Sequence, residues 1–233
     1  MNNQTDHDNK FAGKAPLLLA IIVLGSICGL IEVVLGIFLK QVDFVWNAGL
    51  LTGLGLGMIA IGYAIFKKPF MAIGIALVAV LCKQLVVPVL GETVMCKMNS
   101  CVAVILEYGA FAVIAGITMK RMQAKTKWRW LSGGMAALGG SLAFYFAGMH
   151  IAPCNYLLSF NSFAGFFSFL YKESLSWTIF SAVFVPLGWY VGEKLKAKIT
   201  ALSTDKPVRL YAIASGMALI CWVLSAIAIA QSA

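Results

Sequence analysis

The 233-residue chain is 61% hydrophobic and only 12% charged, with a mean hydropathy of +0.89, whereas soluble domains are roughly 45–50% apolar. A soluble core cannot use that much apolar surface, so a soluble fold is excluded. The formal net charge of +9 does not indicate nucleic-acid binding, because the cations border apolar segments and form no basic and aromatic platform. We expect these cations to set the membrane topology and to contact anionic lipid of the bilayer.

Apolar segments close to the roughly 20 residues needed to cross a bilayer recur along the chain. They predict an all-α fold, a polytopic integral membrane helical bundle, with residues 15–230 forming one transmembrane domain after a disordered cytoplasmic tail, residues 1–14. The aromatic segment Asn155–Tyr171 is interrupted by polar residues and is predicted to lie in the interface or to re-enter the membrane. The seven predicted spans are Ala15–Phe38, Ala48–Phe66, Phe70–Leu90, Val102–Met119, Leu131–His150, Ser176–Gly192 and Leu210–Ile229.

The placement of the cations predicts the orientation of the chain, because Lys and Arg are retained on the cytoplasmic side during insertion. Fourteen of the 18 Lys and Arg residues lie in the N-terminal tail and in the second, fourth and sixth loops. The opposite side holds only Lys40, Lys97 and Lys172, and Lys83 lies inside the third span. We therefore expect a multi-pass protein of the cytoplasmic (inner) membrane with the N-terminus inside and the C-terminus outside.

Glycines recur at every fourth position in the first two spans, at Gly25 and Gly29 and at Gly49, Gly53 and Gly57. Small residues at this spacing let helix backbones approach closely. We expect the neighbours to be other spans of this chain, with a second subunit as the alternative.

Three charged residues, Glu32, Lys83 and Glu107, lie inside apolar spans, where a charge costs several kcal/mol unless it is paired or hydrated. With the predicted orientation, all three lie at similar depth in the outer leaflet, and Asn47 and His150 lie at the same side of the membrane. We predict that Lys83 pairs with one or both carboxylates at the floor of an outward-facing pocket. The alternative is a buried charge cluster that only fixes helix register.

Pro88 follows Lys83 by five residues and removes a backbone hydrogen-bond donor. We expect it to interrupt the third span near Lys83. Irregular backbone at membrane depth is tolerated where it faces protein or a water-filled cavity, and this agrees with a pocket.

The third loop contains the run MCKMNSC, with Met95, Cys96, Met98 and Cys101 close together on the predicted outer side. On an oxidising face, a Cys96–Cys101 disulfide is the default expectation. A Cu(I) site is the alternative, because thiolate and thioether groups suit soft metals. The spacing matches no zinc pattern, and we predict no metal site.

The sequence contains no phosphate-binding glycine loop, no helical pair of metal-binding histidines and no nucleophile elbow. We therefore expect that the protein is not an enzyme and carries no cofactor. Active movement of a solute would draw its energy from a partner or an ion gradient.

Four segments carry a resemblance to a known family: Gly29–Gly36 (GLIEVVLG), Leu51–Ile65 (LTGLGLGMIAIGYAI), Ile73–Leu85 (IGIALVAVLCKQL) and Val102–Ala110 (VAVILEYGA). In order and spacing, the first four spans resemble the substrate-binding S-components of energy-coupling factor (ECF) transporters. The resemblance implies a six-helix core that captures a vitamin, a metal or a related micronutrient in the outer half of the membrane.

In such transporters, a separate transmembrane coupling protein and two cytoplasmic ATPases would be the partners. Glu32, Lys83 and Glu107 would be ligand-binding residues, joined by Asn47 and His150 from their depth. The predicted seventh, C-terminal span departs from the six-span pattern of the family.

Two other functions stay open from the sequence. One is a membrane redox or metal-handling subunit that uses outer-face side chains, namely Met95, Cys96, Met98, Cys101, His150 and Cys154. The other is a structural subunit that anchors a larger complex, for which Lys83 would serve assembly and not ligand binding.

Overall fold

The computed structural model describes residues 14–232, and these residues are helical with no strand among them. The predicted tail lies outside the described residues except for Lys14, which begins α2. The elements are α2 (Lys14–Leu30), the π-helix η1 (Ile31–Leu35), α3 (Gly36–Gln41), α4 (Asn47–Phe66), α5 (Met71–Lys83), α6 (Val86–Leu90), the 3-10 helix η2 (Val94–Lys97), α7 (Met98–Ala124), α8 (Thr126–Ile151), α9 (Asn155–Leu158), α10 (Phe163–Phe169), the π-helix η3 (Leu170–Ser174), α11 (Leu175–Asp205) and α12 (Pro207–Gln231).

Seven helical segments of residues 14–232 are long and apolar enough to cross a membrane, which confirms the predicted number of spans. They are Ala15–Gln41, Asn47–Phe66, Met71–Leu90, Val94–Ala124, Thr126–Ile151, Phe163–Ser203 and Pro207–Gln231. Large apolar side chains such as Leu77, Ile117 and Leu219 are exposed on the outside of the bundle. Lipid tails can cover these faces because they are as apolar as the side chains themselves.

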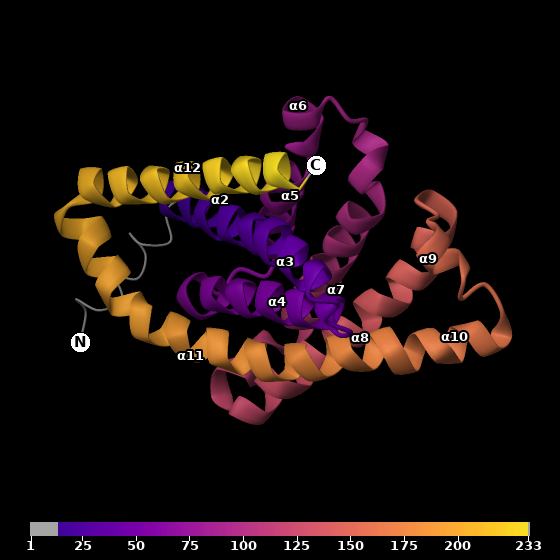
Figure 1. Ribbon diagram of the computed structural model, residues 1–233. Coiled ribbons are helices and arrows are strands. Elements are labelled where there is room, and N and C mark those ends of the chain that lie inside the picture. Colours follow the sequence, from indigo (N-terminus) through magenta and orange to yellow (C-terminus); the bar gives the residue numbers. More distant parts are fainter. Residues whose placement is uncertain (1–13, 233) are drawn as a thin grey trace.

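The spans pack as two groups that meet in the centre of the bundle (Figure 1). α11 runs along α4 and also contacts α8, which pairs with α7. On the other side, α2 packs against α5 and α12. The contact between α5 and α7 joins the two groups, so these two helices frame the region where the predicted charged residues lie.

The glycines of α4 bring α11 into close contact. A side-chain carbon added at Gly53 would lie 2.7 Å from Phe180 Cβ, and one added at Gly188 would lie 1.9 Å from the Gly57 carbonyl oxygen. In the first span, a carbon added at Gly29 would lie 2.3 Å from Cys82 Cβ on α5. The neighbours of these glycines are therefore other spans of the same chain, as predicted.

The sixth span begins earlier than predicted. α10, η3 and α11 follow one another without a break, so the helical segment Phe163–Ser203 includes part of the aromatic stretch that is predicted to lie in the interface or to re-enter the membrane. At 1.5 Å per residue, its 41 residues extend about 60 Å, twice the roughly 30 Å of bilayer hydrocarbon. The segment is therefore longer than the hydrocarbon layer, and aromatic contacts such as those of Phe166 with Tyr145 and Phe146 hold its N-terminal end to α8.

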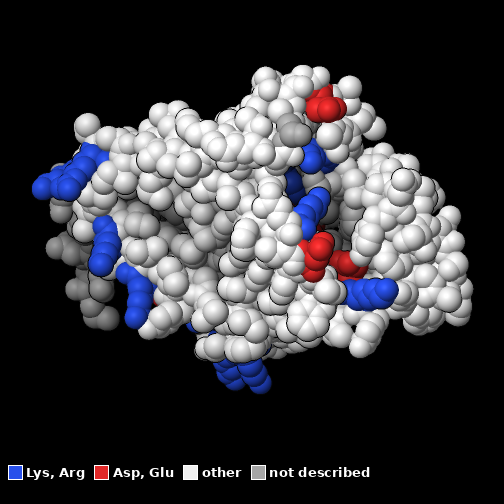
Figure 2. Space-filling view, viewed as in Figure 1, with Lys and Arg blue, Asp and Glu red and all other residues white. Residues whose placement is uncertain are grey.

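Charges are distributed unevenly between the two ends of the bundle (Figure 2). In this view, the end that carries the α11–α12 connection shows basic side chains alone, whereas acidic and basic side chains occur together toward the opposite end. The loops at the basic end include Lys67, Lys125 and Lys206. This distribution agrees with the predicted cytoplasmic position of that end.

The close contact between α4 and α11 predicts that one added methyl group lowers the stability of the protein. Gly188→Ala places Cβ against the Gly57 backbone, which has no side chain that can move aside, so we expect a loss of about 1–3 kcal/mol of stability from overpacking. Gly116→Ala on α7 is the matched control, because no atom lies within 4 Å of its added Cβ. Thermal unfolding in detergent should show a lower Tm for Gly188→Ala only, and equal Tm values for the two variants would contradict this packing.

Candidate functional site

Glu32 and Lys83 form an ion pair inside the bundle. Lys83 Nζ lies 2.7 Å from Glu32 Oε2, and the two side chains are 10% and 7% exposed, respectively. The same ammonium group donates a second, longer hydrogen bond of 3.5 Å to the Ser100 carbonyl oxygen at the start of α7. The predicted pairing of Lys83 with a carboxylate is therefore formed with Glu32, and with its second contact to Ser100 the ammonium group connects three separate spans.

Both members of the ion pair lie where a helix is interrupted. Glu32 belongs to the π-helix η1, which separates α2 from α3, and Lys83 is the last residue of α5. After Lys83 the chain makes a turn, with the Val87 N–H donating to the Gln84 carbonyl oxygen, before the short helix α6. Pro88 lies within α6 and cannot donate a backbone hydrogen bond, so the predicted interruption of the third span is confirmed.

Glu107 lies on α7 without a cation beside it. Its side chain is buried, with the residue 3% exposed, and no ion pair within 4 Å joins it to a cation in the described part of the chain. Oε2 is buried without a hydrogen-bond partner. α8 approaches closely here, since a carbon added at Gly140 would lie 2.9 Å from Glu107 Cα. Of the three predicted charges, two pair and the third stays unpaired.

Tyr108, next to Glu107, is a buried polar residue that sequence reasoning missed. Its side chain is fully buried, and its hydroxyl group has no hydrogen-bond partner. A carbon added at Gly55 of α4 would lie 2.3 Å from this hydroxyl oxygen, so Gly55 leaves the space that Tyr108 fills. The glycine-rich stretch at the start of α4 was the only signal in the sequence.

Two amide side chains near the outer end of the cluster were also missed. Gln84 Nε2 donates to the Val94 carbonyl oxygen and to Cys101 Sγ, both at 3.3 Å, and Asn99 Nδ2 donates to Cys154 Sγ at 3.2 Å. The oxygen atoms of both amides, Gln84 Oε1 and Asn99 Oδ1, are buried without a partner. Buried polar atoms are usually satisfied, so this group of unpaired oxygen atoms is notable.

Asn47 and His150 form no side-chain hydrogen bond or ion pair with the cluster within residues 14–232. Asn47 is the half-buried first residue of α4, and His150 is exposed near the end of α8. Both occupy span ends, where depth alone suggested a role. Depth does not specify the direction of a side chain around its helix, and neither residue forms a hydrogen bond or an ion pair with Glu32, Lys83 or Glu107.

The predicted Cys96–Cys101 disulfide is not formed in this structure. Cys96 lies on η2 and is exposed, whereas Cys101 lies in the second turn of α7 and is buried, with its sulfur accepting the hydrogen bond from Gln84. The change from 3-10 helix to α-helix between them turns the two thiols toward different surroundings. The bridge was predicted because the two cysteines are close in sequence and lie on the predicted oxidising face.

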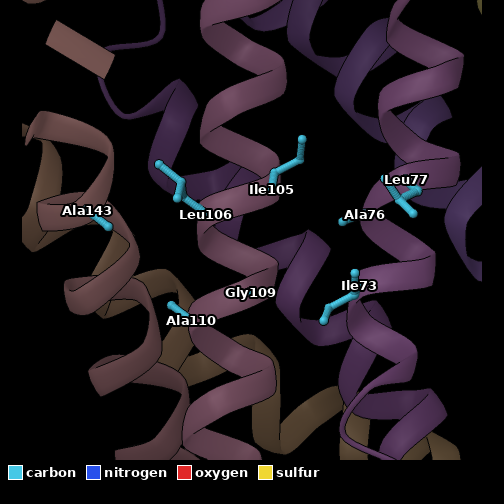
Figure 3. Close-up of a pocket in the computed structure, with 8 residues that line it drawn as sticks. All are labelled: Ile73, Ala76, Leu77, Ile105, Leu106, Gly109, Ala110 and Ala143. Carbon is cyan, nitrogen blue, oxygen red and sulfur yellow. The ribbon is translucent and has the colours of Figure 1, made fainter. Parts of the chain in front are cut away.

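The cavity of about 390 Å³ between α5, α7 and α8 is apolar (Figure 3). Ile73, Ala76 and Leu77 line it from α5, and Ile105, Leu106, Gly109 and Ala110 from α7, with Ala143 of α8 at its edge. Ile73, Leu77 and Ile105 are exposed on the outside of the bundle, so this cavity is a groove on an apolar face. The ion pair does not line it.

No family model, no curated protein and no solved structure matches this chain. Within the described residues, no three His, Cys, Asp or Glu side chains are arranged to hold a metal ion. The candidate site is therefore defined by its geometry alone. It consists of the Glu32–Lys83 ion pair, the unpaired carboxyl group of Glu107, the buried side chains of Thr52 and Tyr108, and the half-buried amides of Gln84 and Asn99, whose oxygen atoms are buried.

Removal of one partner of the ion pair tests its energetic role. Lys83→Met leaves the Glu32 carboxylate buried without a cation, and we expect a loss of about 3–5 kcal/mol of stability. The double variant Glu32→Gln/Lys83→Met removes both charges and should recover most of that loss. Thermal unfolding of wild-type protein, Glu32→Gln, Lys83→Met and the double variant in detergent gives the coupling energy, and additive effects of the two changes would refute a direct pair.

The state of the third-loop thiols can be measured directly. We expect a maleimide reagent to modify Cys96 in folded protein without prior reduction, while Cys101 reacts only after unfolding, because it is 2% exposed. Peptide mass spectrometry distinguishes the two sites. Protection of both thiols that ends on reduction would restore the disulfide.

Proposed function

We propose that this chain captures a small polar solute in the outer half of the membrane, as the substrate-binding subunit of an ECF-type uptake transporter. The observation that carries the proposal is the buried Glu32–Lys83 ion pair with an unpaired carboxyl group, Glu107, on a neighbouring span. Charges inside a membrane are costly and usually mark a ligand or ion pathway. A purely structural cluster would be expected to satisfy its own polar atoms.

The helix interruptions add support to this proposal. Substrate sites in membrane transporters are often formed by discontinuous helices, whose free backbone groups face the ligand. Here η1 interrupts the first span and the turn after Lys83 interrupts the third. π-helical turns such as η1 also occur frequently at functional sites. The two interruptions lie at the ion pair itself and not elsewhere along these two spans.

Orientation and partners complete the proposal. The basic end of the bundle would face the cytoplasm, where a transmembrane coupling protein and two ATPases would dock. The ligand would be a micronutrient of the vitamin or metal-related class, as the resemblance of the first four spans implies. The alternative, a redox or metal-handling subunit, has less support, because Cys96 is exposed and Cys101 is buried against Gln84.

Native mass spectrometry of the purified protein tests ligand capture. We expect wild-type protein to retain a small solute that Glu32→Gln/Lys83→Met loses, because this change removes the charges of the site while leaving no unpaired charge. Arg129→Met/Glu193→Gln is the matched control, since it removes the ion pair at the basic end, which has an N–O distance of 3.0 Å. Equal retention by both double variants would contradict a site at Glu32 and Lys83.

A purification in mild detergent tests the partners. Recovery of a transmembrane coupling protein together with ATPase subunits supports the transporter assignment. A lone chain that transports the solute after reconstitution into vesicles would overturn it, because the proposal gives this chain no energy source of its own.

A further inference from the structure

Glu107 differs from the other two charged residues of the cluster in having no counter-ion. Glu32 neutralises Lys83 at 2.7 Å, and the remaining contact of the ammonium group is to the Ser100 carbonyl oxygen. Lys83 therefore forms no hydrogen bond or ion pair with Glu107. Burying a carboxylate without a cation costs free energy. Its negative charge must therefore be neutralised by a proton or by a positively charged ligand.

The hydrogen-bonding groups around Glu107 do not supply that proton. Thr52 lies beside the Glu107 carboxyl group, but its hydroxyl group donates its single hydrogen to the Ala48 carbonyl oxygen at 2.9 Å. A hydroxyl group that donates its hydrogen to a backbone carbonyl has no further hydrogen to donate to a carboxylate. Glu107 Oε2 has no hydrogen-bond partner at all, so the carboxyl group itself or a ligand must bring the hydrogen.

The other charged and titratable groups near Glu107 do not neutralise its carboxylate. η1 contributes Glu32, α5 contributes Lys83, α7 itself contributes Tyr108, and α2 contributes Cys28 beside Tyr108. α8 presents Gly140 at this point and adds no charge. Because Glu32 and Lys83 cancel each other, Glu107 alone determines the net charge of the cluster.

We propose that Glu107 carries a proton in the ligand-free protein and exchanges it for a small organic cation with N–H donors, such as a protonated amine. One N–H group would donate to the Glu107 carboxylate and a second to the Thr52 oxygen. The carboxyl proton would leave to water as the cation enters, so the net charge of the site stays constant. The exchange rests on the proposed capture function, whereas the proton on Glu107 does not depend on it.

Infrared spectroscopy tests the proton without knowledge of the natural ligand. A protonated carboxyl group has a C=O stretching band separate from the carboxylate bands. We expect this band in wild-type protein at neutral pH, its loss in Glu107→Gln, and its retention in Glu32→Gln. Identical spectra of wild-type protein and Glu107→Gln in this region would overturn the proposal.

Stability gives a second test of the same proton. Glutamine resembles a protonated glutamic acid in shape and charge, so Glu107→Gln should unfold within a few degrees of wild-type protein. Glu32→Gln leaves Lys83 unpaired and should unfold at a clearly lower temperature. The reverse order would show that Glu107 is the charged partner and would overturn the proposal.

Propylammonium chloride is the probe for the exchange. We expect it to reduce the carboxyl band and to release up to one proton per protein into an unbuffered solution, with no response in Glu107→Gln. Sodium chloride at equal ionic strength and sodium propionate are the controls, and neither should change the band. An unchanged band with propylammonium, or an equal response to sodium, overturns the assigned ligand class. A different solute retained in native mass spectrometry would still support the capture function after that result. The capture function and the exchange at Glu107 can therefore be rejected independently.

Discussion

The ion pair between Glu32 and Lys83 constrains the predicted outer half of the bundle. Each charge would cost several kcal/mol in the membrane if it were alone, so η1 and the end of α5 must stay close enough for the 2.7 Å contact. The second contact of Lys83, to Ser100, adds the start of α7 to the same arrangement. One ammonium group thus fixes three spans at one depth, and movement of any of them exposes or separates a charge.

The bundle places a tightly packed region beside this polar region. α4 and α11 meet through glycines, with the backbone of Gly188 against that of Gly57, and such close contacts leave little freedom for rearrangement. The polar cluster lies where η1, the end of α5 and the start of α7 meet, and the first and third spans are interrupted there. Motion that admits a solute is therefore expected on the α2–α5 side, with α4 and α11 acting as the fixed scaffold.

The sequence predicted the number of spans because length and hydropathy determine which helices can cross a bilayer. It also predicted that Lys83 pairs with Glu32, Glu107 or both, since a membrane charge needs a partner at its own depth, and the pair with Glu32 is formed. It did not predict that Glu107 stays apart, because depth along a span does not specify the direction of a side chain around the helix. For the same reason Asn47 and His150 were included, while Gln84, Asn99 and Tyr108 were missed.

Two differences outside the site have local causes. The sixth helix begins at Phe163, before the predicted span, although Asn161, Ser162 and Gly165 lower the hydropathy of this stretch. The disulfide was inferred from the spacing of Cys96 and Cys101 on the predicted outer side. In the structure, Cys96 lies exposed on a 3-10 helix and Cys101 lies buried on an α-helix. π-helical turns such as η1 have no reliable pattern in a single sequence.

The contact between Lys83 Nζ and the Glu32 carboxyl carbon is the most direct test of this account. Solid-state NMR on protein in lipid bilayers, with lysine side-chain nitrogen and glutamate carboxyl carbon labelled, measures their dipolar coupling. A strong coupling that disappears in Glu32→Gln and persists in Glu107→Gln is the predicted result. A coupling that persists in Glu32→Gln and disappears in Glu107→Gln would show that Lys83 pairs with the other carboxylate, and the arrangement of the site described above would be wrong.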